Sequence, residues 1–451
     1  MKVSDINKTT LFESGIRLDA SFHLSEAQTC LSKLKKSSFS KNSLSQLSDN
    51  IFKGNIFKRT YVDNPVNGFS FISASDMMKA EIKSDKYLSK KYSNINNLKV
   101  DKNWILVSRS GTLGNTAYTN EDYKELVLSD DLIRIATNEE KMLSGYLYAY
   151  LSSKYGYNLL TQSSYGGVIQ HIEPHHLFEL PVPLIEESKQ KEIHNLIVEV
   201  SELRVKANIK LNETISLFEN ELNECNVKLG FQIDKISSKE LFSKQKRFDS
   251  QYQVLWKKIK SEYNELKYLK INDLASNIFV GGRGKRNYVA NGTPFLSSSD
   301  MMLFNPVRTT KYISNNTPGL KSMKVEKYDI LISRSGTVGN TIIVGDSLNG
   351  IVVSEHALRL KIDAAKISPN YVFAFLKTKI GKKTMEASSF GSVIITLNED
   401  LIADIDIPIL DEKLQNLISE KVENYINAID NATNKENQAI DLIEKEIDAW
   451  Q

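Results

Sequence analysis

Cysteine is scarce in this chain of 451 residues, and the scarcity limits its chemistry. The two cysteines, Cys30 and Cys225, are far apart and lack the spacing of a metal site. The plain interpretation is a pair of structural thiols in a reducing cytoplasm.

Long apolar runs and a strong net charge are also missing. No run of about 18 or more apolar residues occurs, so we expect no membrane span. The opening segment MKVSDINKTTLFESG has no apolar core of a signal peptide. The net charge of +3, from 58 basic and 55 acidic residues, excludes a general polycation. Local basic clusters that bind nucleic acid are still compatible with that charge.

What the chain does contain is an internal repeat, and a repeat decides the architecture before any single motif does. The segment ILVSRSGTLGNTAY begins at Ile105 and returns as ILISRSGTVGNTII at Ile330. Six further segments recur in the same order: RLDASFH at 17 and RFDSQYQ at 247, FKGNIFKRTYV at 52 and FVGGRGKRNYV at 279, FISASDMM at 71 and FLSSSDMM at 295, LSDDLIRI at 128 and VSEHALRL at 353, SSYGGVIQ at 163 and SSFGSVII at 388, LPVPLI at 180 and IDIPIL at 405. The repeat unit is therefore a domain followed by a tail.

The two tails have the pattern of long amphipathic helices. Residues 186–229 contain no proline or glycine, and apolar residues recur there, as they do in 411–451, at steps of three and four. A helix of about 40 residues is about 60 Å long, and a coiled coil between the two would bury both apolar stripes. The alternative is that each helix packs separately on its own domain.

The repeat predicts four parts and a mixed α and β fold. Short β-branched runs such as WILVS and TIIVG predict strands, and a helical pattern follows them in each copy. The parts are recognition domain 1 at 1–185, spacer helix 1 at 186–229, domain 2 at 230–410 and spacer helix 2 at 411–451. We assign the α+β class and leave the topology inside each domain open.

Signatures of catalysis are absent or fail in the second copy. The QHIEPHH segment suggests a metal cluster, but the matching ITLNEDL contains no histidine. The GGRGKR segment lacks the spacing of a P-loop, and G-x-S-x-G does not occur. The nine prolines are isolated from one another, which excludes the Asn/Asp-Pro-Pro-aromatic tetrad of amino-methyltransferases. We therefore expect no catalytic residue and no metal site in this chain.

The repeated hairpin instead carries groups suited to DNA. Glycines let a backbone approach phosphate closely, hydroxyl and amide side chains donate hydrogen bonds, and arginine binds phosphate or guanine bidentately. The candidates are Ser108, Arg109, Ser110, Thr112 and Asn115 in copy one, and Ser333, Arg334, Ser335, Thr337 and Asn340 in copy two. The alternative is a structural hairpin whose arginine pairs with a nearby aspartate.

Two further pairs of loops are candidates for the same surface. Basic residues beside an aromatic residue recur as Lys58, Arg59 and Tyr61 in copy one and as Arg283, Lys285, Arg286 and Tyr288 in copy two. A solvated basic turn is the alternative for both. The SSYGG and SSFGS loops each present one aromatic ring, Tyr165 and Phe390, that is either a core plug or a wedge against nucleic acid.

These features together resemble the specificity subunit of type I restriction–modification systems, over essentially the whole chain. The resemblance is carried by the R-[LF]-D-x-x-[FY] start, the duplicated S-R-S-G-T-[LV]-G-N hairpin and the [YF]-G-x-V-I … [PD]-[VI]-P-[LI] close before each helix. It implies two target recognition domains, each binding half of a bipartite, asymmetric double-stranded DNA site, and two antiparallel helices that set the spacing.

The resemblance also implies partners. The helices would dock two adenine-N6 methyltransferase subunits, which use S-adenosylmethionine, and two ATP-driven restriction and translocase subunits would complete the complex. This chain would bind no cofactor and catalyse nothing. The nearly identical hairpins would hold the DNA backbone, and the unlike loops around them would distinguish the two half-sites. A fused enzyme or a protein-binding coiled-coil scaffold are the competing interpretations.

Overall fold

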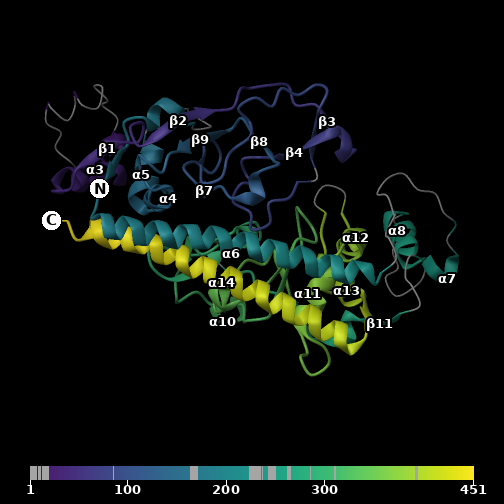
Figure 1. Cartoon of the computed structure of the whole chain (residues 1–451). Helices are drawn as coiled ribbons and strands as arrows, with labels where there is room; N and C mark the ends of the chain where they lie inside the picture. The colour runs from purple at the N-terminus through teal and green to yellow at the C-terminus, as the bar shows by residue number, and fades with distance from the viewer. Residues whose placement is uncertain are drawn as a thin grey trace. The chain divides into compact units, whose positions relative to one another are not determined.

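The chain divides into two compact units, each of which contains one copy of the repeat (Figure 1). The computed structural model describes residues 8, 12, 20–84, 86–162, 171–222, 235, 237–241, 250–261, 266–284, 286–308, 311–391 and 395–450. Unit 1 comprises Met1–Val205 with Asn431–Gln451, and unit 2 comprises Lys206–Asp430. Each unit thus includes part of both long helices, and the four-part division expected from the sequence stays a prediction.

Unit 1 is built on two four-stranded sheets and a two-stranded ribbon. The first sheet has the antiparallel order β2 (Ser48–Lys53), β9 (Leu132–Thr137), β6 (Ile105–Ser108), β7 (Thr116–Tyr118). The second has the order β3 (Tyr61–Val62), β5 (Tyr87–Ser89), β4 (Gly68–Ile72), β8 (Val127–Leu128), in which β4 and β8 are parallel. The ribbon pairs β1 (Lys41–Ser43) with β10 (Pro181–Pro183).

The helices of unit 1 pack on the first sheet and the ribbon. They are α2 (Ala20–His23), α3 (Glu26–Lys36), α4 (Ser144–Ser152) and α5 (Lys154–Gln162), with 3-10 turns at Pro65–Asn67, Glu121–Tyr123 and Pro174–Leu177. Helix α4 is apolar on all sides and is buried almost completely, as such a helix must be. Its tyrosine hydroxyls are satisfied inside the core: Tyr146 and Tyr150 each donate to a β10 carbonyl at 2.6 Å.

Unit 2 repeats this topology strand for strand. Its sheets are β12 (Ala275–Val280), β19 (Ala357–Ile362), β16 (Ile330–Ser333), β17 (Thr341–Ile343), and β13 (Tyr288–Val289), β15 (Lys311–Ile313), β14 (Thr293–Leu296), β18 (Val352–Val353), with the ribbon β11 (Lys267–Lys270) and β20 (Asp406–Ile409). Its helices are α7 (Ser238–Leu241), α8 (Ser250–Ser261), α9 (Ile271–Leu274), α10 (Leu320–Met323), α11 (Pro369–Lys377), α12 (Lys379–Ser388) and α13 (Glu399–Ala403), with 3-10 turns at Asp300–Met302 and Asp346–Leu348. Even the bulge of β2, between Ser48 and Asn50, returns in β12 between Ala275 and Asn277. The repeat and the α+β class are confirmed.

Each unit contains a buried arginine that donates hydrogen bonds to several backbone carbonyls. This role explains why an arginine recurs in the segments LSDDLIRI and VSEHALRL. Arg134 and Arg359 are fully buried on β9 and β19. Arg134 donates to the carbonyls of Leu98, Leu128, Ser129 and Leu132 at 2.9 to 3.2 Å, and Arg359 donates to three carbonyls in unit 2. Burial lowers the pKa of Arg134 to about 10, so the guanidinium stays charged and its hydrogen bonds to neutral carbonyls stay strong.

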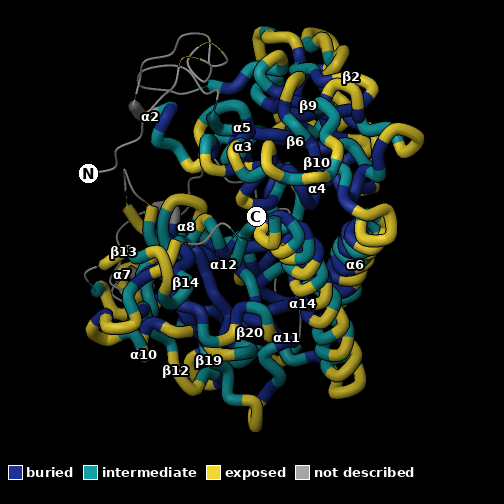
Figure 2. Tube along the Cα trace, turned by 90° about the vertical axis from the view of Figure 1, so that its left-hand side faces the viewer, coloured by how far each residue is buried: buried dark blue, intermediate teal, exposed yellow. Residues whose placement is uncertain are grey.

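The two long helices, α6 (Glu187–Asn220) and α14 (Glu412–Asp448), pack against each other in antiparallel orientation (Figure 1). Salt bridges join Lys189 to Glu446 at 2.5 Å and Glu199 to Lys435 at 3.0 Å, so positions rise along one helix as they fall along the other. The predicted coiled coil is confirmed, and separate packing of the helices is wrong. Figure 2 shows the outward side of α14 exposed and its inward side buried. Residues 223–229 of the first predicted helix lie outside the described residues.

The contact seam of this pair follows steps of four and three, as a coiled coil requires. Its positions are Ile193, Ile197, Val200, Arg204, Ala207, Leu211, Thr214 and Phe218 on α6, and Ile418, Val422, Tyr425, Ile429, Ala432, Glu436, Ala439 and Ile443 on α14. One arginine and one glutamate therefore occupy positions that are otherwise small or apolar. Among the described residues, no helix has both the length and the apolar character of a membrane span.

Candidate nucleic-acid interface

In unit 1, side chains of the predicted basic loop gather around one phenylalanine ring in a group that we call the Arg59 cluster. The Arg59 guanidinium lies 5.3 Å from the centre of the Phe71 ring and donates to Asp130 at 2.5 Å. Tyr61 meets Phe71 edge-on at 6.1 Å and is 48% exposed. The parallel pairing of β4 with β8 brings these residues together, because Phe71 pairs with Val127 and Asp130 comes two residues after the end of β8. Lys58 beside it is exposed.

Unit 2 builds the same arrangement from the matching residues, the Arg286 cluster. Arg286 lies 4.9 Å from the centre of the Phe295 ring and donates to Glu355 at 2.7 Å. Tyr288 meets Phe295 edge-on at 6.1 Å and is 47% exposed. Arg283 reaches the same glutamate at 3.5 Å, with its side chain 87% exposed. Within unit 1 the structure thus places Arg59 near Tyr61 on one phenylalanine ring, and within unit 2 it places Arg286 near Tyr288 in the same way.

The carboxylates of Asp130 and Glu355 raise the pKa values of the arginines that they pair with. Burial lowers the pKa of Arg59, but Asp130 raises it, and the net shift is upward. The pKa of Arg286 is raised chiefly by its hydrogen bond to Glu355. Both guanidiniums are therefore permanently charged, and each lies over a phenylalanine ring beside a partly exposed tyrosine. A rigid cationic plane next to an aromatic surface suits contact with nucleic acid.

One repeated motif of this surface was missed by the sequence analysis. The segments KYLS at Lys86 and KYIS at Lys311 form β5 and β15, at the same separation in sequence as the two hairpins. The Lys311 ammonium lies 5.4 Å from the centre of the Tyr288 ring, and the β14–β15 register sets Lys311 opposite Phe295. Lys86 holds the matching position and is exposed. The repeated Lys-Tyr pair was a sufficient signal, and it adds one cation, Lys311, to the Arg286 cluster.

The S-R-S-G-T hairpins are tight turns that depend on their glycines. Gly111 and Gly114 have φ of 70° and 76°, and Gly336 and Gly339 have φ of 78° and 86°. This left-handed region favours glycine because other residues meet their own carbonyl oxygen there. The repeated glycines are thus explained by the turn itself.

The predicted hydroxyl and amide contacts of these hairpins divide into two groups. Ser108 and Ser333 are buried, and their hydroxyls donate to the carbonyls of Thr112 and Ser335 inside the turn. The structure gives these two serines a structural role in place of the predicted one. The predictions stand for the remaining positions, which are exposed or half-buried: Thr112, Asn115, Thr337 and Asn340.

Arg109 is enclosed by carboxylates. Its guanidinium pairs with Asp131 at 2.9 Å and with Glu173, and its Nε donates to a carbonyl at 3.2 Å. The Ser110 hydroxyl also donates to Asp131, and Lys53 pairs with Glu173 at 2.7 Å. Only 13% of the Arg109 side chain is exposed. The alternative of a structural arginine paired with a nearby aspartate therefore describes Arg109 better than a DNA contact.

Arg334, at the matching position of unit 2, has different surroundings. Its backbone N–H donates to the His356 carbonyl at 3.1 Å, and its carbonyl accepts from Leu397 at 2.8 Å. The Ser335 hydroxyl lies 3.1 Å from His356 Nδ1. Among the described residues, the Arg334 guanidinium forms no ion pair.

The remaining predicted residues are the two aromatic rings of the third loops and one lysine. Tyr165 and Lys285 lie outside the described residues. Phe390 is 44% exposed and its backbone pairs with Thr396. That exposure favours a surface role over a core plug.

The histidines of QHIEPHH act locally. His176 Nδ1 accepts a hydrogen bond from the Glu173 backbone at 3.2 Å and caps a 3-10 turn. Burial, with the neighbouring His175, lowers the pKa of His176. Within the described part of the chain, no three candidate ligand side chains gather as a metal site would require.

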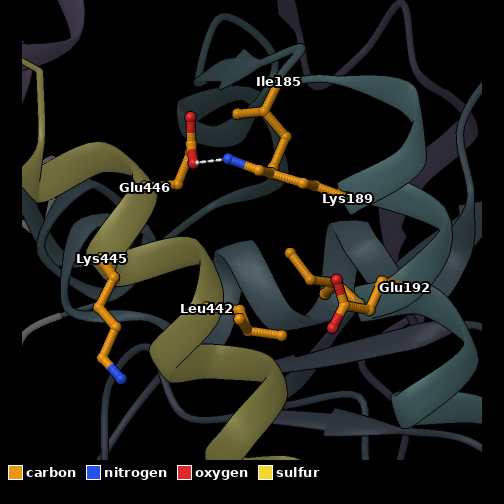
Figure 3. Close-up of a pocket in the computed structure, with 7 residues that line it drawn as sticks. Ile185, Lys189, Glu192, Leu442, Lys445 and Glu446 are labelled. Carbon is orange, nitrogen blue, oxygen red and sulfur yellow. Dashed lines mark hydrogen bonds and ion pairs between the residues drawn. The ribbon is translucent and has the colours of Figure 1, made fainter.

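A small pocket lies between α6 and α14 in unit 1 (Figure 3). Its volume is about 200 Å³, and Lys189 and Glu446 bridge its rim at 2.5 Å. Sites for cofactors typically enclose about 300–1,000 Å³ and are mostly apolar. The mixed charges and small volume of this pocket do not suit a cofactor.

Comparison with known proteins connects this geometry to a family. A family model described as the type I restriction modification DNA specificity domain matches residues 37–217 and again 233–442. A type I restriction–modification S subunit from M. genitalium is similar at 16% identity, over 91% of this chain and 95% of that one, with a TM-score of 0.30. The HsdS subunit of Thermoanaerobacter tengcongensis is similar at 12% identity, over 92% and 97%, also with a TM-score of 0.30. At that score the two structures add nothing to the argument, which rests on the family model. No curated protein matches the chain.

Proposed function

This chain belongs to the family of type I restriction–modification DNA specificity domains, and from that membership we propose that each unit binds one half of a bipartite, asymmetric DNA site. The observation that carries the proposal is the duplicated cluster of arginine, phenylalanine and exposed tyrosine in Arg59–Phe71–Tyr61 and its counterpart in unit 2. Two like scaffolds with one cationic, aromatic surface each are what a two-part site needs.

Differences between the copies support an asymmetric site. The loops before the two clusters are GNIFK at 54–58 and GGRGK at 281–285, which share only their first glycine and final lysine. The first contains an exposed Ile56 and the second an exposed Arg283. An apolar side chain suits a thymine methyl group, and an arginine suits the acceptors of guanine. The two halves would therefore select different bases.

We also propose that α6 and α14 set the number of base pairs between the half-sites and dock two adenine-N6 methyltransferase subunits. In unit 2, these helices leave Ile209 and Leu417 50% and 39% exposed, as an interaction surface requires. The methyltransferase would supply chemistry with S-adenosylmethionine, and two restriction and translocase subunits would complete the complex. The chain itself would select the DNA and catalyse nothing.

Co-expression with a methyltransferase subunit tests the adaptor role. The complex should methylate adenine at a two-part site, detectable by long-read methylation profiling, and the purified chain alone should methylate nothing. Methyl transfer by the chain alone would overturn the proposal in favour of a fused enzyme. A complex that assembles but leaves DNA unmodified at any two-part site would favour a protein-binding scaffold.

An insertion tests the spacing role without disturbing either unit. Seven residues added after Val205 and seven after Asp430 enter both helices at the boundary between the units. Seven residues preserve the seam because they are one heptad, and they lengthen each helix by about 10.5 Å. The spacing should grow by at most about three base pairs of about 3.4 Å, with both half-site sequences unchanged. A five-residue insertion is the control, since it breaks the seam. A change of half-site sequence in the heptad variant would refute the spacing role.

A further inference from the structure

The two S-R-S-G-T hairpins are nearly identical in sequence but differ in the charges that surround their arginines. In unit 1, Arg109 lies between the carboxylates of Asp131 and Glu173, and Lys53 shares Glu173. Two cations therefore face two anions, and this set of four side chains has no net charge. The arginine is satisfied by the protein and largely withdrawn from solvent.

Unit 2 lacks every charged member of this set except the arginine. In the alignment that matches Arg109 with Arg334, His356 replaces Asp131 and Asn398 replaces Glu173. The β12–β19 register places Val280 where β2 has Lys53, since Val280 pairs with Leu358 as Lys53 pairs with Ile133. One guanidinium is left with no carboxylate at either matching position.

The replacing side chains have other partners and supply no carboxylate to the guanidinium. The Asn398 side chain accepts from the Leu401 backbone at 3.0 Å and caps α13. His356 faces the Ser335 hydroxyl at 3.1 Å, and its Nε2 lies 3.8 Å from Glu355, a carboxylate that already pairs with Arg286 at 2.7 Å. The Arg334 backbone is held on both sides, by His356 and Leu397, so the base of its side chain is fixed.

The hairpin also leaves room for a partner. A Cβ added to Gly336 would meet nothing within 4 Å, so open space lies directly above the turn. Thr337 next to it is exposed. A fixed arginine, a hydroxyl and a histidine around an open, glycine-lined turn offer the donors that a phosphate group accepts.

We propose that Arg334, with Ser335 and His356, is a contact for a DNA backbone phosphate in unit 2, and that the matching hairpin of unit 1 makes no such contact. The inference rests on the proposed DNA-binding function and deepens it. The two halves then hold the DNA backbone unequally: the second uses the arginine of its hairpin together with its Arg286 cluster, and the first uses its Arg59 cluster without a hairpin arginine. Arg109 instead has a structural role in unit 1, where its salt bridges join the hairpin to Asp131 and Glu173.

Salt dependence of duplex binding tests this, because each phosphate contact adds about 0.9 to the slope of log affinity against log salt. The probe is a 30-base-pair duplex of arbitrary sequence, since phosphate contacts do not depend on sequence, and the protein is the full chain. Arg334→Ala should lower the slope by about 0.9 and weaken binding roughly eightfold at about 0.1 M salt, which is 0.1 raised to the power −0.9. Arg109→Ala should leave the slope unchanged.

A second pair of variants keeps the arginine and changes only its surroundings. His356→Asp places a carboxylate at the position of Asp131 and should reproduce the loss of slope, and the uncharged His356→Asn is the matched control. The His356 side chain is 55% exposed, so both variants should fold, which circular dichroism checks. If His356→Asp and His356→Asn give equal slopes of log affinity against log salt, or if Arg334→Ala leaves the slope unchanged, the inference about the hairpin is wrong. The proposed DNA-binding function would not be affected by either result. Failure of the wild-type chain to bind the duplex would overturn the proposed function and this inference with it.

Discussion

A buried ion pair in the helix seam gives the sharpest prediction about stability. Arg204 of α6 donates to Glu436 of α14 at 2.7 Å, and the other glutamate oxygen accepts from the Tyr148 hydroxyl at 2.6 Å. Glu436 is 1% exposed, and the Arg204 side chain is 12% exposed. Burial lowers the pKa of Arg204, but Glu436 raises it above its ordinary value. The Arg204–Glu436 pair is therefore charged and buried, and each side chain relies on the other to compensate its charge.

Removing only the arginine should be costly. In Arg204→Ile the Glu436 carboxylate stays buried and loses its cationic partner, while the Tyr148 hydroxyl still donates to it. Breaking one side of a buried pair typically costs about 3–5 kcal/mol, because an uncompensated charge is left inside. We expect the free energy of unfolding to fall by about that amount in a urea titration. Two of the three tryptophans, Trp104 and Trp450, belong to unit 1 and the third, Trp256, belongs to unit 2, so tryptophan fluorescence in a Trp256→Phe background follows unit 1.

The second copy of the repeat shows how the loss should be repaired. At the matching positions of the repeat, unit 2 has Ile429 for Arg204, Leu211 for Glu436 and Phe373 for Tyr148. All three are apolar and pack in one core cluster. The triple variant Arg204→Ile, Glu436→Leu, Tyr148→Phe copies this solution into unit 1.

We expect the triple variant to unfold within about 1 kcal/mol of the wild type, or to be more stable, since well-packed apolar groups often equal a buried ion pair. A loss below about 1 kcal/mol in Arg204→Ile, or a triple variant as unstable as the single one, would refute the reasoning. If the triple variant is stable, the pair is retained for another reason. One polar position in a seam can specify register, and methylation profiling would then find variable spacing between half-sites.

Three further predictions concern the recognition surface and its scaffold. Tyr61→Ala should reduce methylation through one half-site and Tyr288→Ala through the other, each about fivefold if a ring contact contributes about 1 kcal/mol, as profiling of half-site mismatches would show. Gly111→Ala should cost about 1–2 kcal/mol in a thermal melt from its positive φ alone, and Gly114→Ala should cost more because its Cβ would also lie 2.6 Å from a threonine methyl. Burial raises the pKa of the Glu173 carboxyl, but its lysine and arginine partners lower that pKa by more, so the net shift is downward. The stability that the ionised Glu173 carboxylate contributes should therefore be complete above about pH 4.3, the value in the unfolded chain, and should be lost as the pH falls through the lower value of the folded protein. Glu173→Gln should remove this part of the pH dependence in an acid titration of the free energy of unfolding.

Periodic features of the fold were predictable because they depend on residues close in sequence. The seam follows from steps of three and four along each helix, and the strand runs follow from β-branched residues between turns. The turn glycines likewise report a local backbone requirement. The duplication made each of these patterns visible twice, which separated them from chance.

Side-chain partners were not predictable in the same way, because they depend on which strands become neighbours. The parallel pairing of β4 with β8 brings Asp130 to Arg59 from 71 positions away, and no local pattern announces it. The Lys-Tyr pairs of β5 and β15 were present in the sequence, but only the sheet register shows that Lys311 belongs beside Tyr288. A candidate DNA-binding residue could be chosen from the sequence. Whether that residue is already paired with another side chain of the protein could not be predicted.

The hairpins show how far this distinction reaches. Their repetition led to the expectation that Arg109 and Arg334 do the same work. The carboxylates that pair with Arg109 lie 22 and 64 positions after it, at positions where the second copy has other residues. An arginine's electrostatic role is set by the charged groups that the fold places next to it. The difference between Asp131 and His356 therefore says more about the roles of Arg109 and Arg334 than the repeated hairpin sequence does. If the proposed phosphate contact of Arg334 holds, a duplicated sequence has acquired two functions through a change in its surroundings, with the arginine itself unchanged.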